Sequence, residues 1–152
     1  MKISLPVGAW ILLRLITSFC GVFGFSIMFN SPVRLAATAA GIGAIANTLR
    51  LEMVDMTAIP PAGAAFVGAL TAGILASLIK SKVGYPRISL TVPSIVIMVP
   101  GMYLYRGFYN LGIMSLGPAA SWFASAILII AALPLGLIFA RILTDETFRY
   151  CT

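Results

Sequence analysis

The chain has no histidine, only two cysteines and few charged residues. Without histidine, serine hydrolase chemistry lacks its usual base, and zinc sites lose one of their common ligands. The cysteines, Cys20 and Cys151, form no CxxC pair, so we expect neither a metal site nor a structural disulfide. We also expect no cofactor and no enzymatic activity.

Charged residues make up 9% of the 152 residues, whereas hydrophobic residues make up 61%. A soluble domain has roughly 25% charged residues, so a chain this apolar cannot cover its own surface in water. The net charge is +6, but the ten basic residues are scattered, which argues against a nucleic-acid partner. The partner that this composition fits is the lipid bilayer.

Five apolar segments approach the roughly 20 residues that a membrane-spanning helix needs. They cover residues 7–29, 33–49, 59–79, 88–105 and 118–143. The sequence therefore predicts one all-α membrane domain over residues 1–152, a bundle of about five transmembrane helices. Lysine and arginine are more frequent on the side that holds the C-terminus, so we expect the N-terminus outside and the C-terminus in the cytoplasm.

Small residues recur every four positions on three of these segments. The three stripes are Ala36, Ala40 and Ala44; Ala64, Gly68, Ala72 and Ala76; and Ala132, Gly136 and Ala140. Such stripes let helix backbones approach closely. The sequence leaves two roles open for them, packing within the chain and docking of another membrane subunit.

The fourth segment contains two prolines, a glycine and several polar groups. The residues of interest are Pro93, Ser94, Pro100, Gly101 and Tyr103. Each proline removes a backbone donor and frees a carbonyl up to one turn earlier, which is costly in hydrocarbon. Interrupted helices near the midplane are typical of transporter binding sites. We therefore predict an interrupted fourth helix whose residues line a solute path, with an ordinary proline kink as the alternative.

Polar residues bracket the second segment and are further candidates for solute contact. They are Asn30, Arg34, Asn47 and Arg50. For Arg34 and Arg50 the alternative is snorkelling to the membrane surface, which is what we expect of Arg14 in the first segment. No acidic residue lies in the middle of a segment, so Glu52 and Asp55, which we expect in a loop at the membrane edge, are the local carboxylates for any proton coupling.

Three short motifs occur in order along the chain. Residues 24–34 contain Phe29-Asn30-Ser31-Pro32-Val33-Arg34, residues 41–50 run from Gly41-Ile42-Gly43-Ala44 to Leu49-Arg50, and residues 93–103 hold Pro93, Val99-Pro100-Gly101 and Tyr103. They resemble elements of the threonine/serine exporter family: F-N-x-P-x-R after the first helix, a glycine-containing helix closed by arginine, and a P…(V/F)-P-G…Y helix. The match extends over nearly the whole chain. The chain resembles the family's small-subunit type, which corresponds to the C-terminal half of the two-halved exporters.

The resemblance implies a secondary exporter in the bacterial cytoplasmic (inner) membrane, with a larger membrane subunit as partner. It implies that the solute is threonine, serine or a small organic acid such as a dicarboxylate, and we expect the proton gradient to drive export. A non-transporting membrane scaffold or assembly subunit is the alternative function.

Overall fold

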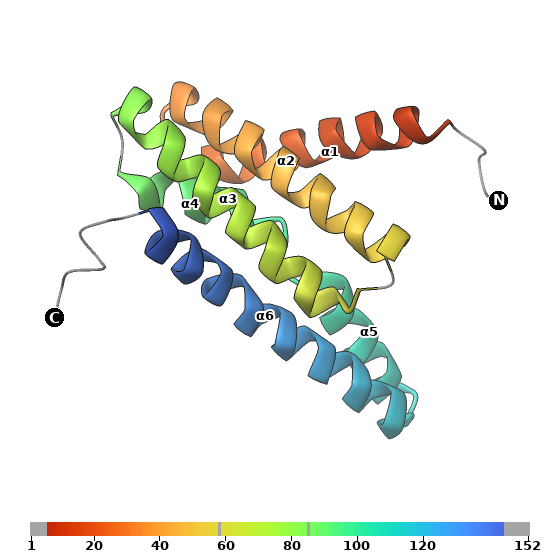
Figure 1. Cartoon of the computed structure of the whole chain (residues 1–152). Helices are drawn as coiled ribbons and strands as arrows, with labels where there is room; N and C mark the ends of the chain where they lie inside the picture. The colour runs from red at the N-terminus through yellow and green to blue at the C-terminus, as the bar shows by residue number, and fades with distance from the viewer. Residues whose placement is uncertain (1–5, 58, 85, 145–152) are drawn as a thin grey trace, which may run out of the picture.

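The computed structural model describes residues 6–57, 59–84 and 86–144, and these residues form α-helices without a strand (Figure 1). The helices are α1 (Val7–Met28), α2 (Val33–Thr57), α3 (Pro61–Val83), α4 (Arg87–Val96), α5 (Gly101–Gly112) and α6 (Leu116–Thr144). Within the described residues, three helices are long and apolar enough to cross a membrane, or four if the bent α4–α5 pair is one span. The predicted all-helical architecture is confirmed, whereas the count of five transmembrane helices is not.

The second helix is longer than the sequence predicted. α2 continues to Thr57, through the stretch from residue 50 to residue 57 that we expected to be a loop. Arg14 of the neighbouring α1 pairs with both Glu52 and Asp55, so the two carboxylates are satisfied without leaving the helix. Because α2 carries four charged residues, it is not among the helices apolar enough to be a span by composition.

The interruption predicted for the fourth helix is present, between Val96 and Gly101. There α4 ends and α5 begins, with a bend of 40° between them. Pro100, which has no N–H to continue the helix, immediately precedes α5. Pro93 lies inside α4, which continues past it, so this proline does not interrupt the helix. α5 extends to Gly112, and most of the connection expected over residues 106–117 is therefore helical.

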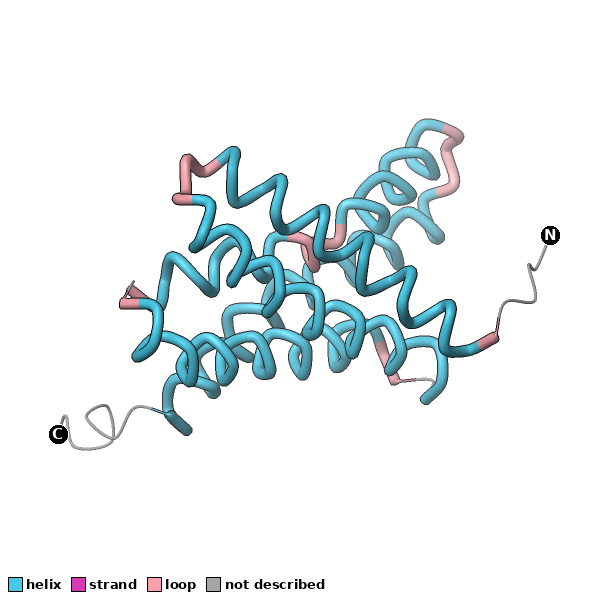
Figure 2. Tube along the Cα trace, turned by 90° about the horizontal axis from the view of Figure 1, so that it is seen from above, coloured by secondary structure: helices cyan, strands magenta, loops and turns pink. Residues whose placement is uncertain are grey.

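The longest helices pack side by side, and short loops join the elements (Figure 2). α3 pairs with α6 along most of its length, α1 pairs with α2, and α4 contacts both α2 and α3. A core of buried side chains between α2, α3, α4 and α6 includes Ile42, Leu90, Met98 and Ile129. Met98 belongs to the break between α4 and α5 and faces the interior of the bundle, whereas the next residue, Val99, is half exposed.

The small-residue stripes lie in the contacts between these helices. A Cβ added to Gly136 of α6 would lie 2.5 Å from the carbonyl oxygen of Phe66 and 2.8 Å from Cβ of Ala69, both on α3. A Cβ added to Gly73 of α3 would lie 2.5 Å from Cβ of Ala140 on α6. Of the two roles left open by the sequence, packing within the chain is the one that these contacts support.

Gly136→Ala tests this close contact. The added methyl group has no room against the α3 backbone, so we expect the free energy of unfolding to fall by about 1–3 kcal/mol. Gly117→Ala on the same helix is the control, because nothing lies within 4 Å of its Cβ position. Thermal unfolding of the two purified variants in one detergent makes the comparison. Equal stability of both variants would show that α3 and α6 are not this close.

Candidate functional site

A short chain of hydrogen bonds links α1 to α2 inside the bundle. Asn47 Nδ2 donates to Ser18 Oγ at 2.9 Å, and Arg50 Nη1 donates to Asn47 Oδ1 at 3.3 Å. All three side chains are buried, and Arg50 is only 9% exposed. Asn47 is therefore held by α1 and in turn orients the guanidinium of Arg50. We call Ser18, Asn47 and Arg50 the polar cluster.

Arg50 is a buried cation without a carboxylate partner among the described residues. Both ion pairs found there are made by Arg14. The Nε–H of Arg50 is buried and has no hydrogen-bond acceptor. Guanidinium groups in protein interiors are normally paired, because desolvating a charge costs several kcal/mol. Arg50 therefore has donor capacity that the described part of the chain does not use.

The break between α4 and α5 lies next to this arginine. A Cβ added to Gly68 of α3 would contact Arg50 Cβ at 3.2 Å and Met98 Sδ at 3.3 Å, so Gly68 brings both residues together. On the α1 side, Ile97 of the break packs on Gly21. Residues from three helices thus cover the inner side of the break, whereas Val99 on its outer side is 50% exposed.

Ser94 joins α4 to α2 on the near side of the break. Its buried Oγ lies 2.9 Å from the carbonyl oxygen of Ala39 and 2.6 Å from that of Leu90, so its hydroxyl donates within the chain. Gly43 allows this approach, since a Cβ there would lie 3.0 Å from the Ser94 carbonyl oxygen. Ser94 fixes the start of the break against α2.

Tyr103 lies in the first turn of α5, just after the break, and packs partly buried against the core of the bundle. The ring packs edge-on against Trp122 of α6, with 5.6 Å between the centroids. Trp122 in turn carries Arg106 over its face, 4.9 Å from the ring centroid. The contact with Trp122 therefore holds the first turn of α5 against α6.

The structure brings some of the predicted site residues together and leaves others apart. Asn47 and Arg50 meet in the polar cluster, Tyr103 follows the break at Pro100 and Gly101, and Pro93 and Ser94 lie on α4 just before it. Asn30 and Arg34 are exposed near the opposite end of α2. Sixteen residues, about 24 Å of helix, separate Arg34 from Arg50. Asn30 has φ 55°, a left-handed conformation that ends α1.

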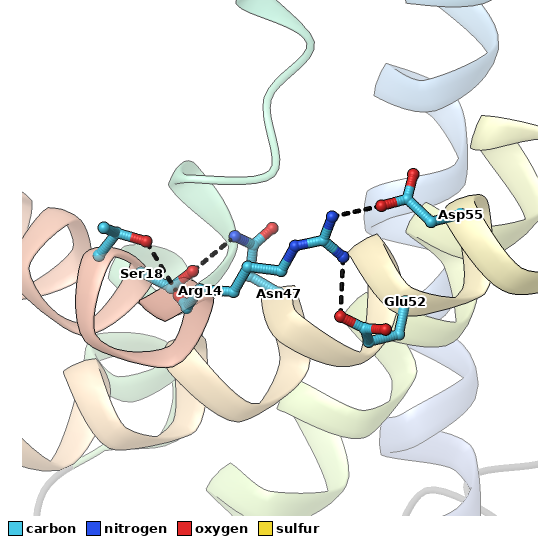
Figure 3. Close-up of polar contacts among 6 residues, drawn as sticks. Arg14, Ser18, Asn47, Glu52 and Asp55 are labelled. Atoms are coloured by element: carbon cyan, nitrogen blue, oxygen red, sulfur yellow. Dashed lines mark hydrogen bonds and ion pairs between the residues drawn. The ribbon is translucent and has the colours of Figure 1, made fainter. Parts of the chain in front are cut away.

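An ion-pair cluster that the sequence did not predict lies beyond the polar cluster on α2. Arg14 Nη1 donates to Glu52 Oε1 at 2.7 Å, and Arg14 Nη2 pairs with Asp55 (Figure 3). Arg14 therefore pairs with carboxylates, whereas we expected it to snorkel. The pairing and the role of Ser18 share one sequence signal. Arg14, Ser18 and Ser26, four and eight residues apart, place polar groups on one face of a mostly apolar helix.

Comparison of the sequence with models of protein families identifies the family of this chain. The family model described as "Threonine/Serine exporter, ThrE" matches residues 14–143. The chain belongs to the threonine/serine exporter family. The matched range contains the polar cluster, the break and all nine predicted site residues. The comparisons with curated proteins and with solved structures give no match.

Membership of the threonine/serine exporter family confirms the resemblance drawn from the sequence motifs. It identifies the chain as related to exporters of that family, and with the apolar helices it indicates a multi-pass membrane protein. In such a protein a charged side chain buried between helices is expensive and is retained for function. Arg50 is therefore the first candidate for contact with a transported solute.

Charge reversal tests the ion pair between α1 and α2. Arg14→Glu places three carboxylates together, so we expect a lower yield of folded protein and a lower melting temperature. The double variant Arg14→Glu/Glu52→Arg restores an opposite charge beside Asp55, and we expect it to recover much of the loss. Size-exclusion profiles and melting curves in detergent report both effects. If the double variant were no more stable than the single one, the pairing would be wrong.

Proposed function

We propose that this chain is the smaller subunit of a secondary exporter and that Arg50 binds the carboxylate of the exported solute. The observation that carries the proposal is the buried guanidinium of Arg50, with an unused Nε–H and no carboxylate partner among the described residues. A guanidinium presents five donors in a planar fork that matches a carboxylate. A solute carboxylate supplies the acceptors that this part of the chain lacks.

The substrate class follows from the group that Arg50 recognises. Threonine, serine and succinate all carry a carboxylate, so each meets this requirement. The family description names threonine and serine, which makes an α-amino acid the first substrate to test and a dicarboxylate the second. Ser18 and Asn47 hold the guanidinium in place, so they act by positioning Arg50.

The break between α4 and α5 supplies the moving part. Arg50 is only 9% exposed, and the buried side chain of Met98 lies near it beside Gly68. Access therefore requires a displacement of residues 97–100. Rotation of α5 about this segment moves Met98 and Tyr103 together, which uncovers the guanidinium. Discontinuous helices at the solute site are a common arrangement in secondary transporters.

A larger membrane subunit completes the carrier in this proposal. Alternating access normally sets one bundle moving against another, and the described residues supply only three or four spans by composition. α1 has the fewest buried residues of these spans and leaves Leu12 and Ile16 exposed. Its outer face is therefore the proposed contact for the partner, because the small-residue stripes are already used within the chain.

The ion-pair cluster is the proposed point of proton coupling. Glu52 and Asp55 are the only carboxylates among the described residues, and both pair with Arg14. They lie within two turns of Arg50 on α2, at the end of the bundle predicted to face outward. A proton that entered from outside and neutralised one of them would weaken the contact between α1 and α2 that positions Asn47.

Arg50→Met tests the solute site. Met has a similar length but no charge, so we expect efflux of labelled threonine, serine or succinate to fall roughly 10-fold or more. The melting temperature should stay the same or rise, because an incompletely paired buried charge has been removed. Efflux is measured in cells that also carry the larger subunit, and cells with this chain alone give the background.

Two variants complete that experiment. Arg50→Lys keeps the charge but loses the planar fork, so its efflux should lie between that of Met and of the wild type. Arg106→Met removes an exposed arginine outside the polar cluster and should export normally. Wild-type efflux by Arg50→Met at wild-type abundance would exclude Arg50 from the solute site and favour a scaffold role.

The double variant Pro100→Ala/Gly101→Ala tests the moving part. Alanine favours helix, so the variant should join α4 to α5, insert normally and lose export. Pro134→Ala is the matched control, because Pro134 lies inside α6 without interrupting it. Cysteine cross-linking between α5 and α6 reports the geometry independently of transport. A joined helix with undiminished efflux would show that the break is only a packing kink.

A further inference from the structure

Three cations surround a pocket that lies away from the polar cluster, at the ends of α3 and α6 and the start of α4. The pocket has a volume of about 390 Å³ and is lined by Lys80 of α3, Arg87 at the start of α4 and Arg141 in the last turns of α6. These three helix ends lie together at one end of the bundle (Figure 1). We call this site the basic pocket.

The basic pocket gathers positive charge. Three of the described residues that line it, Lys80, Arg87 and Arg141, are cations that come from three different helices. Arg87 is held in position by donation from Nη2 to the carbonyl oxygen of Gly73 at 3.2 Å. The pocket also includes the first turn of α4, where the backbone N–H groups of the helix start favour a phosphate or carboxylate.

The apolar part of the lining distinguishes a lipid from a free anion. Ile88 and Ile138 line the pocket and are 67% and 49% exposed, so its rim continues into the apolar outer surface of α4 and α6. A small hydrated anion gains nothing from exposed isoleucines. An anionic phospholipid fits both parts, because its phosphate meets the cations while its acyl chains lie along the isoleucines.

We propose that the basic pocket binds the headgroup of an anionic phospholipid. Lys80, Arg87 and Arg141 are the phosphate-contacting residues, and the hydroxyl-bearing Thr91 forms part of the floor. The pocket lies on the side predicted to face the cytoplasm, and basic pockets between helices on that side recognise lipid headgroups. The bound lipid links the ends of α3, α4 and α6, and it does so independently of the proposed solute site.

Lipid binding to the purified full chain tests this inference. Native mass spectrometry and melting curves are recorded with phosphatidylglycerol, with phosphatidylcholine, and with inorganic phosphate alone. We expect phosphatidylglycerol to be retained and to raise the melting temperature, whereas the other two have no such effect. An equal effect of inorganic phosphate would identify a free-anion site, and equal retention of phosphatidylcholine would mean that the headgroup charge is not recognised.

Charge-matched variants locate the site. Lys80→Gln/Arg141→Gln should weaken phosphatidylglycerol binding by about 10-fold or more. Arg34→Gln/Arg106→Gln removes two exposed arginines outside the pocket and should bind the lipid as the wild type does. Arg141→Lys changes the side chain but keeps its charge, so it should retain binding. This variant separates loss of charge from damage to the structure at position 141. Undiminished binding by Lys80→Gln/Arg141→Gln would overturn the proposal.

Discussion

Helices in a bilayer gain little hydrophobic free energy by associating, because lipid tails are as apolar as leucine. This chain depends instead on close contact at glycine and alanine. Gly136 brings the backbone of α6 against Phe66 of α3, and Gly107 similarly fits α5 against the ring of Phe123 on α6. Gly43 seats α4 on α2 at Ser94. These contacts set how near the helices lie to one another, and the polar cluster, the break and the basic pocket lie between helices placed in this way.

The same close packing makes any incompletely paired polar group inside the bundle costly. Arg50 has one hydrogen bond and an unused Nε–H, and the neighbouring segment of residues 97–100 lacks regular helical hydrogen bonds. A structure selected for stability alone would replace an arginine here with an apolar residue of similar size. The proposed solute site accounts for this charge, because a binding site can require a group that lowers the stability of the fold.

The charged groups are divided between the two ends of the bundle. At one end Arg14 pairs with both Glu52 and Asp55, so a described contact between α1 and α2 depends on carboxylate charge. At the other end Lys80, Arg87 and Arg141 gather around the basic pocket. Arg50 lies between the two groups, next to the break. The proposed proton coupling and the proposed lipid contact therefore act on different helices and do not compete for the same charges.

The sequence by itself determined the class of protein and the place of the break. Low charge and long apolar runs exclude a water-soluble fold, and Pro100 cannot continue a helix because it has no N–H. The three motifs identified the family because they preserve local order and spacing. Only the tertiary structure decided the partners of each polar side chain. Ser18, Asn47 and Arg50 meet because α1 packs on α2, whereas Asn30 and Arg34, equally prominent in the sequence, lie near the other end of α2. Local rules set where a helix ends, but contacts between distant segments depend on helix packing that no local pattern specifies.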